Sequence, residues 1–316
     1  MVKYIIKRVI ACVFVLIALS FLAFMVLNLT PGDSATSVLT HTFIGFDDPI
    51  YEEDVQAVSN MYGLEEPLIV QYGKWLGMAF TGNLGTSIVY NQPVIGMVAS
   101  KVPWTLLLGL CAFAASFIIS VPLGMLLAKR RNGILDHICR VLSIMLGSMP
   151  GFWVALMLLI VFAIWLGWLP VYGVGSPLGV ILPGVTLMIG MIPSTLRITR
   201  STMSNVLGQD YMLTAKSKGL TNRQTILRHG VRNSLTPVIT MAGLEVGHIL
   251  GGSVIVENIF SWPGIGKLLY DSIMAKDVPM MQGCIIFIAM GYVISMFLVD
   301  LITAIVDPRM RVGGAR

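Results

Sequence analysis

The sequence has few charged residues. Of its 316 residues, 12% are Asp, Glu, Lys or Arg, whereas 56% are hydrophobic. Soluble domains carry about 25% charged residues, so this composition excludes an ordinary soluble domain, and the mean hydropathy of +0.83 agrees. The chain must place most of its surface in lipid. The net charge of +5 does not indicate nucleic-acid binding, because the basic residues lie at the ends of apolar runs and not in one patch.

The sequence also lacks paired cysteines. Its four cysteines, Cys12, Cys111, Cys139 and Cys284, are scattered, and no C-x-x-C spacing occurs. This spacing excludes a zinc-finger motif and gives no disulfide framework. We interpret the four as small buried apolar residues.

No nucleotide-binding loop is present. Such a loop reads G-x-x-x-x-G-K-[ST], and the nearest stretch, GIGKL at 264–268, lacks both the first glycine and the final hydroxyl residue. No Ser/His/Asp arrangement is indicated either. We therefore expect neither an enzyme nor a chain that itself binds a cofactor.

Six apolar runs have the length of a membrane span, which needs about 20 residues. The first follows Lys7 and is too long for the apolar core of a signal peptide, so we expect it to be retained. Continuous rather than alternating apolar runs indicate helices. The sequence thus predicts an all-α polytopic protein with spans at about 8–30, 102–129, 138–168, 178–201, 236–257 and 281–306.

The distribution of Lys and Arg predicts the orientation. If the N-terminus is cytoplasmic, seventeen Lys and Arg lie in cytoplasmic segments and four lie outside. The positive-inside rule then puts both termini in the cytoplasm. The four outside are Lys74, Lys101, Lys267 and Lys276.

Two long polar segments interrupt the spans. Residues 31–101 form an external segment with a predicted helix near 51–61. We interpret it either as a cap that seals the helices or as a platform for a substrate-delivering protein. Residues 203–236 form a cytoplasmic loop between the fourth and fifth spans, and 102–316 form a five-helix core that contains this loop.

The cytoplasmic loop is predicted to contain two short helices. Gly219 marks the break, because glycine accepts the positive φ that ends a helix. Thr221 and Gln224 have the spacing of a capping box that starts the second helix. Pro237 is expected where the next apolar helix begins. The alternative is a solvated connector that only obeys membrane topology.

Glu245 and His248 are the notable polar residues inside a predicted span. They lie three apart and therefore share a helix face. Because an unpaired charge in the membrane costs roughly 2 to 3 kcal/mol, both should face the protein interior or water. They could form a structural pair or line a translocation pathway. Carboxylate and imidazole also suit a divalent transition metal, but two ligands are too few for a closed site.

Several stretches resemble one family. The order of Ala215, Gly219, Ile226 and Pro237 in TAKSKGLTNRQTILRHGVRNSLTPVIT is similar to the EAA loop of ABC importer permeases, in the form found in the peptide/nickel family. LTPGD, YGLEEPLIVQY, GNLGTS, SMPGFWVA, ENIFSWPGIGKLLYDSI and VDLITAIVDPRMR also resemble that family. The resemblance covers nearly the whole chain.

The resemblance implies a permease subunit in the bacterial inner membrane that forms half of a pathway working by alternating access. It implies four partner subunits: a second homologous permease, two cytoplasmic ATPases that use ATP and Mg, and an extracytoplasmic binding protein. It implies that the loop couples to an ATPase, and we expect that role for Thr214, Ala215, Lys218, Gly219, Leu220, Thr221 and Ile226.

The substrate is open between short peptides, which the family implies broadly, and nickel or a metal chelate, which Glu245 and His248 slightly favour. Two other classes are considered. A secondary transporter or channel would show inverted repeats, and we find none that convinces. An intramembrane enzyme would need a catalytic set inside spans, for which Glu245, His248 and Asp300 are the candidates.

Overall fold

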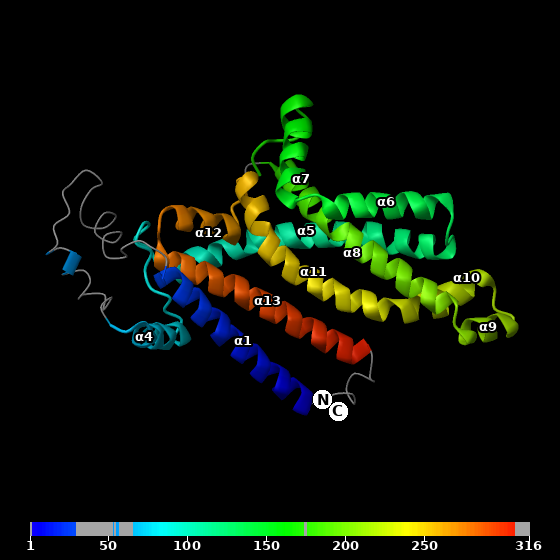
Figure 1. Ribbon diagram of the computed structural model, residues 1–316, viewed down its shortest axis with the longest axis horizontal. Coiled ribbons are helices and arrows are strands. Elements are labelled where there is room, and N and C mark those ends of the chain that lie inside the picture. The colour runs from blue at the N-terminus through cyan, green and yellow to red at the C-terminus, as the bar shows by residue number, and fades with distance from the viewer. Residues whose placement is uncertain (1, 30–52, 54, 57–65, 174–175, 307–316) are drawn as a thin grey trace. The chain divides into compact units, whose positions relative to one another are not determined.

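The computed structural model describes residues 2–29, 53, 55–56, 66–173 and 176–306 (Figure 1). These residues form helices joined by short connections, with no strand among them apart from one isolated bridge between Thr86 and Pro93. The predicted all-α class is therefore confirmed for the described residues. The chain divides into two compact units, described separately below: unit 1 comprises residues 1–10, 106–262 and 292–316, and unit 2 comprises 11–105 and 263–291.

Four helical segments within the described ranges are long and apolar enough to cross a membrane. They lie in α1 (Val2–Leu29), in α5 (Val94–Lys129), in η3 (Pro177–Val180) with α8 (Ile181–Leu207), and in α13 (Val278–Val306). A bent pair, α6 (Ile134–Ser148) with α7 (Gly151–Leu158) and η2 (Leu159–Trp165), would make a fifth. The fifth predicted span, at 236–257, corresponds to α11 (Arg232–Ile259), which is not among these segments. The count of six thus stays a prediction.

The prediction of an unbroken helix through 138–168 is wrong, and the prediction that this stretch crosses the membrane stays a prediction. The chain breaks at Met149 and Pro150, and the helices on either side are bent by 100°. Met149 has φ −81° and ψ 129°, and Pro150 also has extended backbone. The cause is local, because the proline ring disfavours the helical conformation of the residue before it. Hydropathy alone cannot detect such a break.

Unit 1 is centred on α8, which packs against α6, α7 and α11 (Figure 1). Ala155, Leu182, Val256 and Phe260 form one of its buried apolar clusters. The backbone N–H of Gly173 donates to the carbonyl of Phe260 at 3.0 Å, which ties the connection after η2 to the end of α11.

Unit 2 joins the two segments that the sequence places outside the membrane. Its cluster combines Trp75 of α4 (Leu68–Phe80) and Val94 with Leu268 of α12 (Ile265–Met274) and Met280. Such packing is expected of segments on the same side of a membrane. The helix predicted near 51–61 lies largely outside the described residues.

A buried carboxylate organises the connection before α5. Asp277 accepts a hydrogen bond from the Ser87 hydroxyl, and it accepts backbone N–H groups of Ile88 and Val89, each at 3.3 Å. Asp277 is almost fully buried. Because a buried charge is tolerated only when it is hydrogen-bonded, these donors explain why an aspartate can precede α13.

Close helix packing within unit 1 depends on glycine in α11. A Cβ atom added at Gly243 would overlap the side chain of Val299 in α13, including its Cβ atom, whereas one added at Gly251 would meet nothing within 4 Å. Small residues allow such close approach of membrane helices.

We predict opposite effects for two Gly→Ala substitutions in α11. Gly243→Ala should destabilise the protein by about 1–3 kcal/mol through overpacking. Gly251→Ala should be neutral or stabilising by up to about 1 kcal/mol, because Ala is the better helix former. The midpoint of thermal unfolding in detergent measures both. Equal midpoints for the two variants would show that α11 and α13 do not pack this closely.

Candidate functional site

The candidate site predicted from the sequence is the segment of short helices that follows α8. We call residues 208–231 the elbow. It consists of α9 (Asp210–Ser217), a break at Gly219, α10 (Asn222–Thr225) and the π-helical turn η4 (Ile226–Val231). Gly219 has a φ of +86°, so the predicted glycine break is confirmed.

The predicted capping box is also confirmed. The backbone N–H of Gln224 donates to the Thr221 hydroxyl at 3.3 Å, and the backbone N–H of Thr221 donates to Oε1 of Gln224 at 3.0 Å. These two bonds satisfy backbone donors that the start of α10 would otherwise leave unpaired.

The prediction for Pro237 is wrong. Pro237 lies inside α11, which begins at Arg232 and follows η4 without a break. Proline is favoured in the first turn of a helix, where no N–H donor is needed, and this preference indicated the wrong position for Pro237. A proline in the interior costs one backbone hydrogen bond, and membrane helices tolerate this loss where neighbouring groups compensate.

One face of the elbow is held against the rest of unit 1. Met212, Ala215 and Thr225 are buried. At Gly230 an added Cβ would lie 3.0 Å from the terminal methyl of Met203 in α8. The elbow is therefore a packed element of unit 1.

The other face of the elbow is exposed and partly apolar. Leu213 is 68% exposed and Leu227 is 58% exposed. Of the predicted coupling residues, Ala215 is buried and Leu220 and Ile226 are half-buried. Exposed positions are held by Thr214, Lys218, Gly219 and Thr221. The elbow also presents exposed Arg223 and Arg228. This face therefore combines exposed apolar and basic groups.

Glu245 is buried in α11 and accepts a hydrogen bond from the Ser194 hydroxyl of α8. The predicted pairing with His248 stays a prediction, because the side chain of His248 lies outside the described residues. Among the residues described, no group of three His, Cys, Asp or Glu side chains could hold a metal ion.

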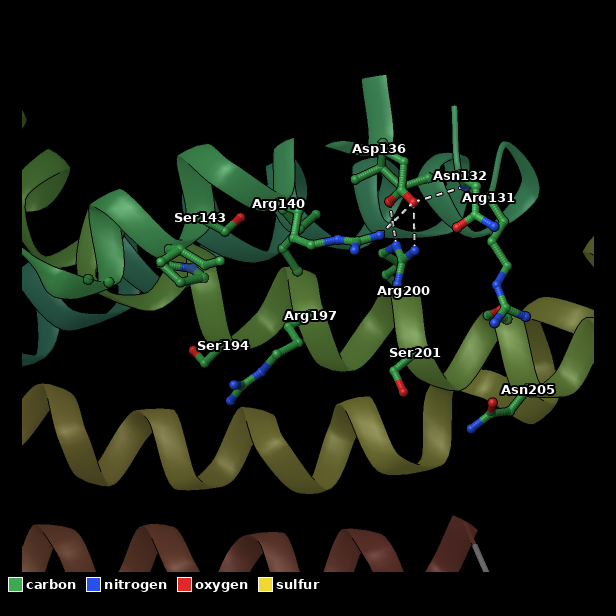
Figure 2. Close-up of a pocket in the computed structure, with 17 residues that line it drawn as sticks. Arg131, Asn132, Asp136, Arg140, Ser143, Ser194, Arg197, Arg200, Ser201 and Asn205 are labelled. Atoms are coloured by element: carbon green, nitrogen blue, oxygen red, sulfur yellow. Dashed lines mark hydrogen bonds and ion pairs between the residues drawn. The ribbon is translucent and has the colours of Figure 1, made fainter. Parts of the chain in front are cut away.

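A second polar cluster lies between α6 and α8 (Figure 2). Asp136 has no exposed side-chain surface. Arg200 donates to it through Nε at 2.5 Å and through Nη2 at 2.6 Å. Arg140 contacts the same carboxylate at 3.2 Å, and the backbone N–H of Asn132 donates at 3.1 Å. Charge-assisted, two-pronged pairing of this kind is the strong form of an ion pair.

Sequence reasoning missed this cluster. Arg140 and Arg200 contributed only to the count of basic residues that predicts the orientation. Asp136 and Arg200 are 64 positions apart, so no local spacing indicates that they pair. A signal existed, since an ionisable residue within or beside an apolar span needs a partner. The sequence alone could not say which partner Asp136 takes.

A cavity of about 920 Å³ lies at this cluster. Four arginines line it against one carboxylate, Asp136. Figure 2 shows Arg140 and Arg200 directed at Asp136, whereas the guanidinium groups of Arg131 and Arg197 lie away from it. Neither Arg131 nor Arg197 forms an ion pair with any side chain that the structure describes.

Comparison with known proteins gives a consistent result over the whole length. Residues 120–312 match the sequence profile of the binding-protein-dependent transport system inner membrane component, and residues 1–109 match the profile of its N-terminal part. An oligopeptide transport system permease protein of Bacillus subtilis is 37% identical over 98% of this chain and 99% of its own length. A glutathione transport system permease protein of Pectobacterium atrosepticum is 35% identical over 98% of this chain and 99% of its own.

A solved structure of the MetNI methionine ABC transporter in an inward-facing conformation has the same fold. The TM-score is 0.55 at 16% sequence identity, over 67% of this chain and 97% of that chain. At this identity the likeness concerns the fold alone.

We predict that Asp136→Asn destabilises unit 1 strongly. The substitution leaves Arg200, whose side chain is mostly buried, without its anionic partner, and breaking a buried pair costs about 3–5 kcal/mol. The control is Asp271→Asn, which breaks the partly exposed pair with Lys267 and should cost less than about 1 kcal/mol. Thermal unfolding in detergent measures both. The double variant Asp136→Asn with Arg200→Gln should recover part of the loss, and equal losses for the two single variants would contradict the assignment.

Proposed function

The chain belongs to the family of binding-protein-dependent transport system inner membrane components, and from this premise we propose that it forms half of the translocation pathway of an ATP-driven importer of short peptides. It is a multi-pass inner membrane protein and a permease subunit of an ABC importer. Its role is transport and not enzymatic catalysis.

The proposed complex contains a second homologous permease, two cytoplasmic ATPases that bind ATP and Mg, and an extracytoplasmic binding protein. The family description names a dependence on a binding protein. The absence of a nucleotide-binding loop from the sequence supports a separate ATPase. The external segment at 31–101 is proposed to receive the binding protein.

The elbow is proposed to transmit ATPase motion to the helices. Its inner face is packed against unit 1, while Leu213 and Leu227 are exposed. Large apolar side chains that remain exposed in such a packed element favour a protein contact. Of the predicted coupling residues, Ala215, Leu220 and Ile226 would then hold the elbow's shape. Thr214, Lys218, Gly219 and Thr221 lie on the open surface.

This role requires the elbow to be cytoplasmic. The proposed orientation places both termini and the elbow there. Its support is that seventeen Lys and Arg then lie in cytoplasmic segments and only four lie outside. The packing of 66–101 with 263–291 in unit 2 supports a common side for the two segments proposed to be external.

Peptides are proposed as the substrate because the relatives are described as permeases for oligopeptides, peptides and glutathione. The preference for nickel gains no support from these descriptions, and Glu245 is engaged by Ser194. The secondary-transporter alternative is likewise disfavoured, because the matched relatives are subunits of transport systems that depend on binding proteins. Glu245 remains a candidate for the pathway, since it is a buried carboxylate between α8 and α11.

We predict that Gly219→Leu reduces substrate uptake about tenfold. A Cβ would find open space at Gly219, so the effect comes from the backbone φ of +86°. An L-residue pays about 1–2 kcal/mol there, which corresponds to about a tenfold shift away from the required conformation. The matched control is Gly208→Leu at the other end of α9, where φ is −87° and uptake should change little. Gly219→Asn should be intermediate, because Asn tolerates positive φ. If Gly219→Leu retains full uptake and full stimulation of the ATPase, the role of the elbow is wrong.

We predict that Leu213→Asn and Leu227→Asn each weaken retention of the ATPase during purification. Both side chains are exposed, so unit 1 should fold normally and only the external apolar contact is lost. Leu178→Asn is the control, because Leu178 is 50% exposed in η3 and lies far along the chain from the elbow. A reduction for Leu178→Asn as large as for the elbow variants would argue against a specific contact.

We predict uptake of labelled dipeptides, and not of nickel, by cells that lack other importers and express this permease with its partner subunits. A background without the permease provides the control. Nickel uptake that depends on this chain and falls with Glu245→Gln would reinstate the metal interpretation.

A further inference from the structure

The side chains that line the cavity between α6 and α8 carry more positive than negative charge. Arg200 and Arg140 share the carboxylate of Asp136. Two further guanidinium groups, those of Arg131 and Arg197, line the same space without an ion pair to any described residue. Glu245 does not line the cavity. It accepts a hydrogen bond from the hydroxyl of Ser194, which does. The cavity therefore carries an excess of about three positive charges.

The shape and chemistry of this cavity suit an anionic group. Its volume of about 920 Å³ lies within the range of ligand pockets, about 300–1,000 Å³. Guanidinium groups bind phosphate oxygens through two parallel N–H donors. The hydroxyls of Ser201 and Ser204 and the amide of Asn205 add neutral donors to the lining. A phosphate group would meet charge and hydrogen-bond donors together.

The helix next to the cavity indicates where the phosphate comes from. α6 turns Asp136, Arg140 and Ser143 to the cavity, while its other side exposes a row of large apolar residues. These are Ile134, Leu135, Ile138, Val141, Leu142 and Met145. An amphipathic helix of this kind suits a lipid, because the exposed aliphatic residues can contact the acyl chains and the arginine can bind the head group.

We propose that this cavity binds the phosphate of an anionic phospholipid from the cytoplasmic leaflet, with Arg131 and Arg197 as the free cationic groups. Basic pockets between membrane helices on the cytoplasmic side are a known form of anionic head-group site. The inference rests on the proposed orientation, which places the ends of α5 and α8 in that leaflet. It does not depend on the elbow's role in coupling.

The test measures lipid binding to the transporter purified with its partner subunits. Phosphatidylglycerol and phosphatidylcholine are titrated separately, and bound lipid is counted by native mass spectrometry. The unaltered protein should bind phosphatidylglycerol preferentially. Arg131→Gln with Arg197→Gln should weaken that binding about 30-fold, because each basic residue near the surface contributes about fivefold. Both side chains are exposed and neither forms an ion pair with a described residue, so the double variant should fold.

Controls separate this site from general charge effects. Lys129→Gln with Arg130→Gln removes two exposed charges at the end of α5 that do not line the cavity, and should leave phosphatidylglycerol binding unchanged. Equal binding of the two lipids by the unaltered protein, or unchanged phosphatidylglycerol binding by the cavity variant, would overturn the proposal. So would complete displacement of the lipid by millimolar inorganic phosphate, which would identify a site for free anions. A defect in uptake or ATPase coupling leaves this readout unaffected, so failure of the proposed function is distinguishable from failure of this inference.

Discussion

Buried charge in this chain is compensated by a specific partner, and the arrangement of unit 1 depends on that constraint. In an apolar environment an unpaired carboxylate is strongly disfavoured. Asp136 therefore takes two contacts from Arg200, one from Arg140 and one backbone N–H, which fixes the start of α6 against α8. Asp277 in unit 2 follows the same rule with the hydroxyl of Ser87 and with backbone donors. These few polar contacts determine which apolar helices meet, because apolar side chains alone pack against many surfaces without preference.

The elbow fits this constraint because its charge remains outside the packed region. Its basic residues Arg223 and Arg228 are exposed, while Ala215 and Thr225 face inward. Gly219 lets the chain reverse between α9 and α10, and the capping box of Thr221 and Gln224 fixes the start of the second helix. The result is a compact surface of charge and exposed leucine joined directly to α8 and α11. In the proposed mechanism, a push on that surface moves α8 and α11, which also carry the bonded pair Ser194 and Glu245.

Local signals were predictable from the sequence, and long-range pairings were not. The glycine break at Gly219 and the capping box depend on residues within a few positions of one another, so spacing was enough to predict them. The bend at Met149 and Pro150 was also local, but hydropathy outweighed the proline in the prediction of a continuous span. Pro237 lies inside a helix that begins at Arg232, so the preference of proline for helix starts does not locate it. The partner of Asp136 is 64 residues away, and no pattern within one sequence selects Arg200 over the other arginines.

The central claim is that the elbow contacts an ATPase on the cytoplasmic side and carries its motion to the membrane helices. Hydrogen–deuterium exchange of residues 210–231 tests it most directly, measured in the permease with and without its ATPase partners. The account predicts that the partners slow exchange in this segment, and that ATP binding changes the protection further. Equal exchange in the presence and absence of the ATPases would contradict the account.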